Sequence, residues 1–176
     1  MRRMHATAAG ILLGLGLAVG GAATAQTVIP GGENGDWKAY TFKKGGVTVC
    51  YMASAPKKSE GDYSKRDAAY ALVTNDPTTS SHGEVSFVAG YPFKKDSTVG
   101  VTIGGKTFEL FTKTDKAPDG AWTQGPEDDR SLVAAMVGGE DMVVKGVSSR
   151  GTETVDTYSL LGFTATRKVI DKICPK

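Results

Sequence analysis

The sequence is poor in the side chains that most often carry out catalysis or bind metals. It has 176 residues but only two histidines and two cysteines. His82 is the only histidine after residue 25, and it directly follows Ser80 and Ser81. A hydrolytic triad needs a histidine base held by a carboxylate beside a nucleophile, and a structural zinc site needs four nitrogen or sulfur ligands. The sequence therefore disfavours both sites, and we expect His82 in an exposed loop.

The net charge of the chain is also small. Lys and Arg total 21 and Asp and Glu total 19, which gives a formal net charge of +2. Arg2 and Arg3 account for this excess, so the chain after residue 25 is formally neutral. A neutral chain has no overall field that attracts nucleic acid. We therefore expect no nucleic acid partner. No second long hydrophobic run appears, so we also expect no membrane span in the mature chain.

The first 25 residues have the order of features found in a secretory signal peptide. Arg2 and Arg3 are followed by an uncharged apolar run over residues 6–21, and residues 23–25 then form a small-x-small cleavage site. The apolar run is shorter than the ~20 residues of a membrane-spanning helix. We therefore expect cleavage before Gln26 and export. The periplasm is the expected location, and the cell surface is the alternative.

Export bears directly on the two cysteines, Cys50 and Cys174. Two thiols in a small exported chain favour one disulfide, because the compartments outside the cytoplasm are oxidising. The bridge would close a loop of about 125 residues, which the chain-entropy model values at roughly 5 kcal/mol. Two free buried thiols are the alternative.

Beyond the leader, the residue pattern predicts a loose arm and then one domain of short strands. Residues 26–36 are glycine-rich and polar, which is typical of a flexible N-terminal arm. Alternating apolar residues predict strands over residues 37–42, 47–52, 69–74, 84–93, 99–103, 106–110, 142–147 and 152–160, with a charged loop over 56–65. Helices are predicted over 127–137 and 163–173. We expect residues 37–176 to form a β-sandwich or open barrel of short antiparallel strands with two small helices, one of them C-terminal.

Residues 99–110 form the clearest local unit. Gly104 and Gly105 suit a two-residue type I′ turn, in which both positions need a positive φ. Pairing outward from this turn places Val99, Val101, Ile103, Lys106, Phe108 and Leu110 on one face. Residues 100–107 also fit the phosphate-loop pattern G-x-x-x-x-G-K-[ST], but that loop must lead into a helix, and residues 108–111 continue as a strand. We therefore predict a β-hairpin and no nucleotide site.

Three further motifs have both a chemical and a structural interpretation. Residues 54–57 fit the acyl-transfer pattern S-x-x-K, but its supporting motifs are missing, and a turn after a strand is favoured. The carboxylates of residues 127–129 could touch calcium, but they also suit the start of a helix. The lysine pairs at 43–44, 57–58 and 94–95 could gather to bind an anionic glycan or membrane surface. Isolated pairs that guard strand edges are favoured instead.

An ordered series of short segments runs along the chain. It consists of Cys50-Tyr51-Met52, Glu84-Val85-Ser86-Phe87, Gly90-Tyr91-Pro92-Phe93, Ala135-Met136, Arg150-Gly151-Thr152, Asp156-Thr157-Tyr158-Ser159-Leu160, Gly162-Phe163 and Cys174. This series resembles the invasion-associated locus B family of small exported alphaproteobacterial proteins. The likeness runs from residue 37 to residue 174. It implies an envelope or surface protein, with the family's cysteine pair at Cys50 and Cys174. The family takes its name from a member linked to entry into host cells, and it supplies no catalytic residues.

Two classes of function remain after these exclusions. The first is a non-catalytic envelope protein that binds a protein or a glycan and supports contact with a host cell, through its sheet edges or the turn at residues 150–152. The second is a periplasmic hydrolase that uses two carboxylates about 5–10 Å apart. We expect the binding protein. We assign no catalytic, cofactor-binding or metal-binding residue, and neither the partner-binding residues nor the oligomeric state follows from the sequence.

Overall fold

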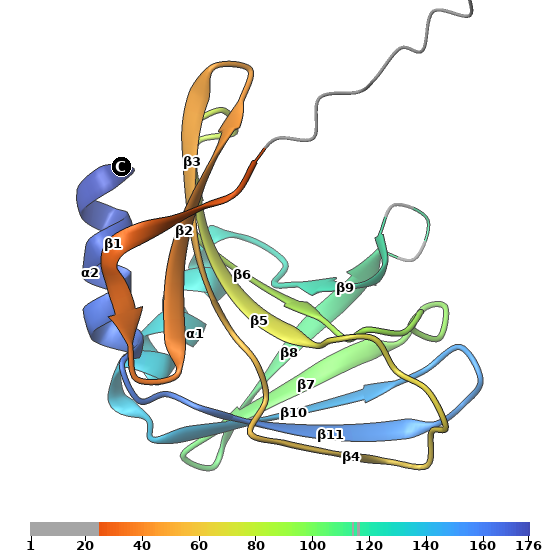
Figure 1. Cartoon of the computed structure of the whole chain (residues 1–176). Helices are drawn as coiled ribbons and strands as arrows, with labels where there is room; N and C mark the ends of the chain where they lie inside the picture. The colour runs from red at the N-terminus through yellow and green to blue at the C-terminus, as the bar shows by residue number, and fades with distance from the viewer. Residues whose placement is uncertain (1–24, 114, 116) are drawn as a thin grey trace, which may run out of the picture.

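The protein has eleven strands and two helices in the computed structural model, which describes residues 25–113, 115 and 117–176 (Figure 1). The predicted signal peptide lies outside the described residues except for Ala25. In chain order the elements are β1 (Thr27–Asn34), β2 (Trp37–Lys44), β3 (Val47–Ser54), β4 (Lys58–Gly61), β5 (Tyr70–Asp76), β6 (Ser81–Val88), β7 (Thr98–Ile103), β8 (Lys106–Lys113), β9 (Ala117–Trp122), α1 (Pro126–Gly138), β10 (Asp141–Val147), β11 (Glu153–Ser159) and α2 (Phe163–Ile173).

All the described strands belong to one antiparallel sheet in the order β1-β2-β3-β5-β6-β9-β8-β7-β10-β11-β4. β4 follows β3 in the sequence but pairs with β11 at the far edge of the sheet. The sheet therefore curls, so that β1 to β3 stand upright in Figure 1 while β7, β10 and β11 cross below them. The prediction of a mainly β fold with two helices, one of them C-terminal, is confirmed. Its form is a single open sheet and not two packed sheets.

The hairpin of β7 and β8 is confirmed with the predicted register. Val99 pairs with Leu110, and Ile103 pairs with Lys106. The turn residues Gly104 and Gly105 have φ values of 54° and 82°, as a type I′ turn requires. Because this segment is a strand pair and no helix follows the turn, it does not form a phosphate loop.

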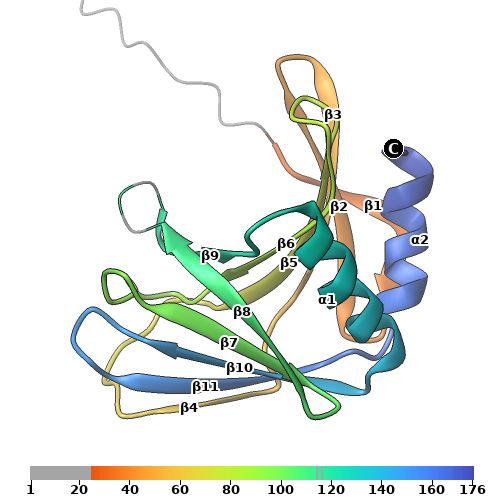
Figure 2. The same cartoon turned by 180° about the vertical axis from the view of Figure 1, so that it is seen from behind.

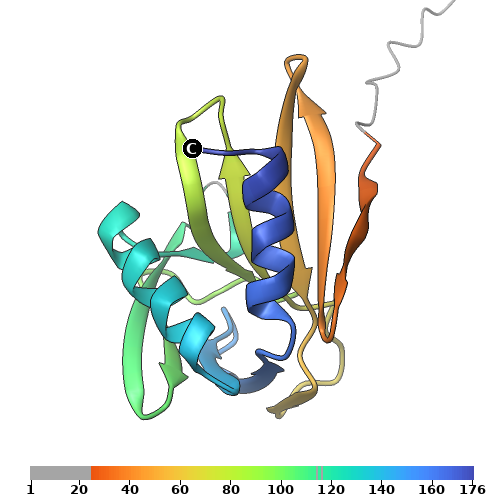
Figure 3. The same cartoon turned by 90° about the vertical axis from the view of Figure 1, so that its left-hand side faces the viewer.

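The N-terminal segment differs from its prediction as a loose arm. Residues 27–34 form β1, which pairs with β2 and buries Ile29. The glycines in this segment hid its strand character, because a neighbouring strand supplies the order that local propensity does not. Figure 3 shows β1 running along the outer side of β2. The register of this pair shifts between Val28 and Glu33, which places Pro30 at the irregularity where a strand tolerates proline.

Two other strands were missed and one was predicted too long. β4 lies in the segment expected to be a charged loop, and all four of its residues are exposed. β9 contains a proline, an aspartate and a glycine, which locally favour a turn. β6 ends at Val88, although alternation continues to Phe93. The regular strand is interrupted at Gly90, which has a φ of 70°, although Phe93 N still donates to the Pro118 carbonyl of β9 at 2.7 Å.

The two helices cover the interior of the curled sheet on one side (Figures 2 and 3). Phe163 and Ile170 of α2 are buried, and the Phe163 ring meets the Trp37 ring edge-on with centroids 5.0 Å apart. α1 buries Leu132 and Met136 against the core. Neither helix, in the part of the chain described, is long and apolar enough to cross a membrane.

Candidate functional site

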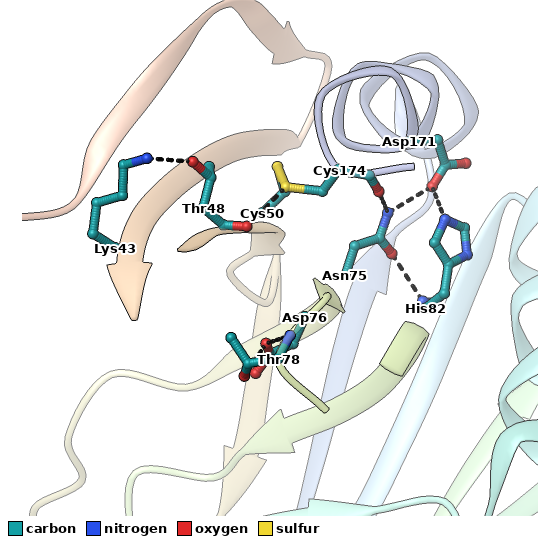
Figure 4. The surroundings of a disulfide bond; sticks show 10 residues. Lys43, Thr48, Cys50, Asn75, Asp76, Thr78, His82, Asp171 and Cys174 are labelled. Carbon is teal, nitrogen blue, oxygen red and sulfur yellow. Dashed lines mark hydrogen bonds and ion pairs between the residues drawn. A yellow bond between two sulfur atoms is a disulfide. The ribbon is translucent and has the colours of Figure 1, made fainter. Parts of the chain in front are cut away.

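The predicted disulfide is present between Cys50 on β3 and Cys174 at the end of α2 (Figure 4). Their Cα atoms lie 5.9 Å apart, and 124 positions separate them in the sequence. Both residues are buried. The alternative of two free thiols is therefore wrong, and the bridge attaches the last helix to the sheet.

A polar network surrounds this disulfide and includes His82 (Figure 4). The Asn75 side-chain amide donates to the Cys174 carbonyl at 3.0 Å and to Asp171 Oδ1 at 2.9 Å. His82 Nε2 lies 3.4 Å from the same Asp171 oxygen. The expectation of an exposed loop histidine is wrong, because His82 is half-buried on β6 beside α2. Ser81, the nearest serine before it, donates its hydroxyl to Glu84, so the described contacts form no triad at this histidine.

The other sequence motifs have structural roles. Ser54 is buried at the end of β3 and donates to the neighbouring Ala55 carbonyl, whereas Lys57 forms an ion pair with Asp36 at 2.7 Å. These separate contacts do not support acyl transfer. Asp129, at the start of α1, accepts hydrogen bonds from the Val85 backbone amide at 2.8 Å and from the Thr123 hydroxyl at 2.7 Å. Its carboxylate thus joins the helix to β6.

The lysine pairs do not gather into one patch. Four of the six lysines have nearby partners: Lys43 with Thr48, Lys44 with Asp76, Lys57 with Asp36, and Lys58 with Glu60. Burial alone would raise the pKa of Asp76, but hydrogen bonds from Lys44 and Thr78 outweigh it and hold that pKa below 3.8. These lysines therefore fix strand ends locally, as the structural interpretation predicts.

A hollow of about 480 Å³ lies where the β4–β5 loop, the β6–β7 loop and the β10–β11 turn meet. We call it the Arg66 hollow. It is lined by Asp62, Tyr63, Ser64, Lys65, Arg66, Asp67, Gly90, Tyr91, Pro92, Ser148, Ser149, Arg150, Thr152 and Thr154. Its volume falls within the range of about 300–1,000 Å³ typical of ligand sites. Most of its side chains are polar, and it carries charges of both signs.

The floor of the Arg66 hollow rests on a buried ion pair. Arg66 Nη1 and Nη2 donate to the two carboxylate oxygens of Asp156 at 2.8 and 2.5 Å. The two side chains are only 5% and 6% exposed. Burial alone would lower the pKa of Arg66, but its hydrogen bonds with Asp156 and the opposite charge outweigh it and raise that pKa. Arg66 therefore stays charged and ties the β4–β5 loop to β11.

Two tyrosines enclose the Arg66 guanidinium. Its central carbon lies 5.5 Å from the Tyr63 ring centroid and 5.0 Å from that of Tyr91. Arg66 Nε also donates to the Ala89 carbonyl at 2.7 Å. The Tyr91 hydroxyl lies 2.5 Å from the Thr154 hydroxyl, and burial raises the pKa of Tyr91. These contacts fix the orientation of Arg66 and leave the outer side of the hollow open.

A close backbone approach also shapes this site. Asp67 N donates to the Gly90 carbonyl at 3.0 Å. A Cβ atom on Gly90 would lie 2.2 Å from the Asp67 carbonyl oxygen, and the φ of Gly90 is 70°. Only glycine combines this φ with so close a neighbour. Gly90 therefore lets the β4–β5 loop lie against the end of β6.

The turn at residues 150–152 forms the opposite wall. Ser148 N donates to the Thr152 carbonyl at 2.9 Å, and Gly151 N donates to the Ser148 carbonyl at 2.8 Å. Arg150 is exposed at the tip of the turn. A further hydrogen bond from Ser149 N to the Pro92 carbonyl, at 2.7 Å, joins this turn to the β6–β7 loop. The turn singled out in the sequence is thus a wall of the hollow.

Sequence patterns did not reveal Arg66. It lies in an irregular segment 90 positions from Asp156, and no local spacing connects the two residues. Part of the signal was nevertheless present, because three segments of the family resemblance, residues 90–93, 150–152 and 156–160, meet at or beside this hollow.

Comparisons with known proteins agree with this resemblance. A family model described as "Invasion associated locus B (IalB) protein" matches residues 37–171. Among three matching solved chains is the crystal structure of invasion associated protein B from Bartonella henselae. It is similar to this chain with a TM-score of 0.57 and 15% identity, over 80% of this chain and 94% of that one. At this identity the likeness shows the fold alone. No curated protein matches.

Proposed function

The chain belongs to the invasion associated locus B (IalB) family, and from that premise we propose that it is an exported, non-catalytic binding protein of the cell envelope. Its partner, a protein or a glycan, docks at the Arg66 hollow. The observation that carries the proposal is the hollow itself, in which three segments distant in sequence form an open polar site over a buried ion pair. The word "invasion" in the family description suggests a host cell as one source of the partner.

The exposed charges of the hollow suit a polar partner. Lys65 and Arg150 carry positive charge, Asp62 and Asp67 carry negative charge, and all four residues are exposed. Exposed charges at a rim contribute mainly to specificity and to the rate of association. The Arg66 guanidinium beneath them is held on three sides, so its side chain loses little conformational entropy when a partner binds.

The carboxylates of the hollow do not favour the hydrolase alternative. A glycosidase acid typically sits in an apolar pocket that keeps it protonated, whereas Asp62 and Asp67 are exposed. Asp156 is buried, but both its oxygens accept hydrogen bonds from Arg66. Asp156 is thus committed to holding the loop.

The sheet edges are less suited to docking than the hollow. β1 contains Pro30 and an irregular register with β2, and β4 is four residues long with Lys58 and Glu60 exposed. Short, charged or proline-containing edges resist the addition of a strand. Partner contacts therefore centre on the hollow and the turn that forms its wall.

Export to the periplasm or the cell surface is part of the proposal and rests on two features. The leader has the features of a signal peptide, and the buried disulfide suits an oxidising compartment. Sequencing the N-terminus of the protein from fractionated cells tests it. We expect a chain that begins at Gln26 in the periplasmic or surface fraction, and an uncut chain in the cytoplasm would contradict export.

A capture experiment tests the binding role. The mature protein is immobilised and exposed, with cross-linking, to envelope extract and separately to host-cell membrane extract. We expect a specific partner that is lost when Lys65→Glu and Arg150→Glu are combined. Lys168→Glu combined with Lys172→Glu, both at exposed positions of α2, is the matched double charge reversal and should retain the partner. A partner that the double variant retains would show that binding lies elsewhere. Hydrolysis of an envelope polymer by the wild type that is lost in Asp62→Asn and Asp67→Asn would favour the hydrolase.

A further inference from the structure

A second hollow, separate from the Arg66 hollow, lies on the outer face of the sheet beside Trp122. Its volume is about 270 Å³, and it is lined by Thr79, Ser80, Ser81, Glu84, Lys113, Trp122, Thr123, Gln124, Gly125, Pro126 and Asp129. None of these residues lines the Arg66 hollow. We call it the Trp122 hollow.

The Trp122 ring occupies space over Gly120, which has no side chain to displace it. The two residues are two positions apart on β9 and therefore point to the same face. A Cβ atom on Gly120 would lie 2.2 Å from Cη2 of the indole. Ala121 between them is fully buried in the core, so Trp122 points outward. Gly120 thus lets a broad apolar ring lie along a surface where water can reach it.

Polar groups surround this ring on the open side. Lys113 Nζ lies 5.2 Å from the centroid of the indole. Glu84 accepts a hydrogen bond from the Ser81 hydroxyl at 3.2 Å, and Gln124 is exposed. Asp129 is already used by Val85 and Thr123. Among the lining hydroxyls, those of Thr79 and Thr123 donate to the Asp76 carbonyl and to Asp129. The groups left to meet a ligand are therefore one ammonium, the second oxygen of Glu84, one amide and the Ser80 hydroxyl, and the engaged hydroxyls can still accept.

We propose that the Trp122 hollow binds a single neutral sugar ring of a glycan. The C–H face of a pyranose is apolar and can lie on a flat indole, while its hydroxyls need the mixture of donors and acceptors found around this ring. The hollow is lined by one cation, Lys113, and two carboxylates, Glu84 and Asp129. It therefore has no excess positive charge to attract an acidic sugar, which favours an uncharged ligand. The volume lies just below the range of about 300–1,000 Å³ for drug-sized ligands and suits one ring. Lys113 is exposed, so it can leave the ring face and hydrogen-bond the sugar.

The indole N–H signals in a two-dimensional NMR spectrum test this proposal. The protein has two tryptophans, and Trp37 is buried with its indole donating to the Ser159 carbonyl at 3.0 Å. The mature protein is titrated with the methyl glycosides of glucose, galactose, mannose and N-acetylglucosamine, and with methyl glucuronide as a charged sugar. We expect at least one neutral glycoside to shift the Trp122 signal with saturation in the millimolar range, while the Trp37 signal stays fixed.

Two glycine variants make the test specific. Gly120→Ala displaces the indole without removing it and should weaken binding about tenfold. Gly100→Ala is the matched control, because its Cβ would meet only Thr107 Cγ2 at 3.9 Å on β8, and it should bind normally. Trp122→Ala should abolish binding, and because this variant lacks the indole signal, its binding is read from the backbone amide signals of Gln124 and Gly125 in the hollow. The double variant Lys65→Glu, Arg150→Glu should bind the glycoside normally, which separates this proposal from that for the Arg66 hollow.

Three results would overturn the proposal. The first is a Trp122 signal that no glycoside moves. The second is equal binding by the wild type and Gly120→Ala. The third is a response to the glucuronide alone, which would show that the site selects charge and not a neutral ring.

Discussion

Removing one partner of the Arg66–Asp156 pair should destabilise the protein far more than removing both. Arg66→Met leaves the Asp156 carboxylate buried without its ion-pair partner, and Asp156→Leu leaves the guanidinium in the same position. The two side chains are 5% and 6% exposed, so water cannot replace the lost partner. Breaking a buried pair costs about 3–5 kcal/mol, whereas replacing both members with apolar residues is often close to neutral.

The structure sets the expected size of each change. Each single variant should lose about 3–5 kcal/mol of unfolding free energy, which lowers the Tm of a domain of this size by about 6–20 °C. The double variant Arg66→Met, Asp156→Leu should lose about 2 kcal/mol or less, because its main remaining cost is the hydrogen bond from Arg66 to the Ala89 carbonyl. The coupling energy between the two positions is then about 4 kcal/mol or more in magnitude.

Urea unfolding of the four proteins measures this cycle directly. Lys57→Met serves as a control, because the Lys57–Asp36 pair has side chains 59% and 25% exposed and should be worth about 1 kcal/mol at most. If each variant at Arg66 or Asp156 also costs about 1 kcal/mol or less, or if the two costs simply add, the pair does not hold the loop in the way described.

Three other changes follow from the same structure. Replacing Cys50 and Cys174 with alanine should lower the unfolding free energy by roughly 5 kcal/mol, which is measured as a lower Tm. The wild type in reductant should show a similarly lowered Tm, and a Tm equal to that of the oxidised wild type would contradict this. Gly90→Ala should cost about 2 kcal/mol more than Gly46→Ala in urea unfolding, since both have a positive φ but only the former has a close neighbour; equal costs would argue against the close approach. Asp76→Asn should cost about 1 kcal/mol at neutral pH. Because the pKa of Asp76 is held below 3.8, the difference in unfolding free energy between the wild type and this variant should be constant above pH 3.8 and vanish as the pH falls through the lowered pKa. Unfolding curves at several pH values measure this difference. A difference that grows in acid would contradict the assignment.

Features with a local signal could be predicted from the sequence. The hairpin turn at Gly104 and Gly105 fixes its own register, because both glycines supply the φ that the turn needs and the flanking residues alternate. The disulfide was predictable because Cys50 and Cys174 are the only cysteines. The end of α2 was marked by a proline shortly after it.

Features that depend on distant partners could not be predicted. β1 is glycine-rich and becomes a strand because β2 lies beside it. Arg66 and Asp156 are far apart in the sequence, and their meeting depends on how the whole sheet curls. His82 likewise acquires its environment from Asp171 on α2. The candidate site is therefore a product of topology, and in the sequence it was marked only by the segments 90–93, 150–152 and 156–160 of the family resemblance.

Cross-linking within living cells tests the central claim most directly, which is that the Arg66 hollow receives the partner. A photoreactive residue placed at Ser149, on the wall of the hollow, should form a discrete adduct with another molecule outside the cytoplasm. The same residue placed at Glu109, exposed on the outer face of β8, should form none. An adduct from both positions, or from neither, would contradict the assignment of the Arg66 hollow as the binding site.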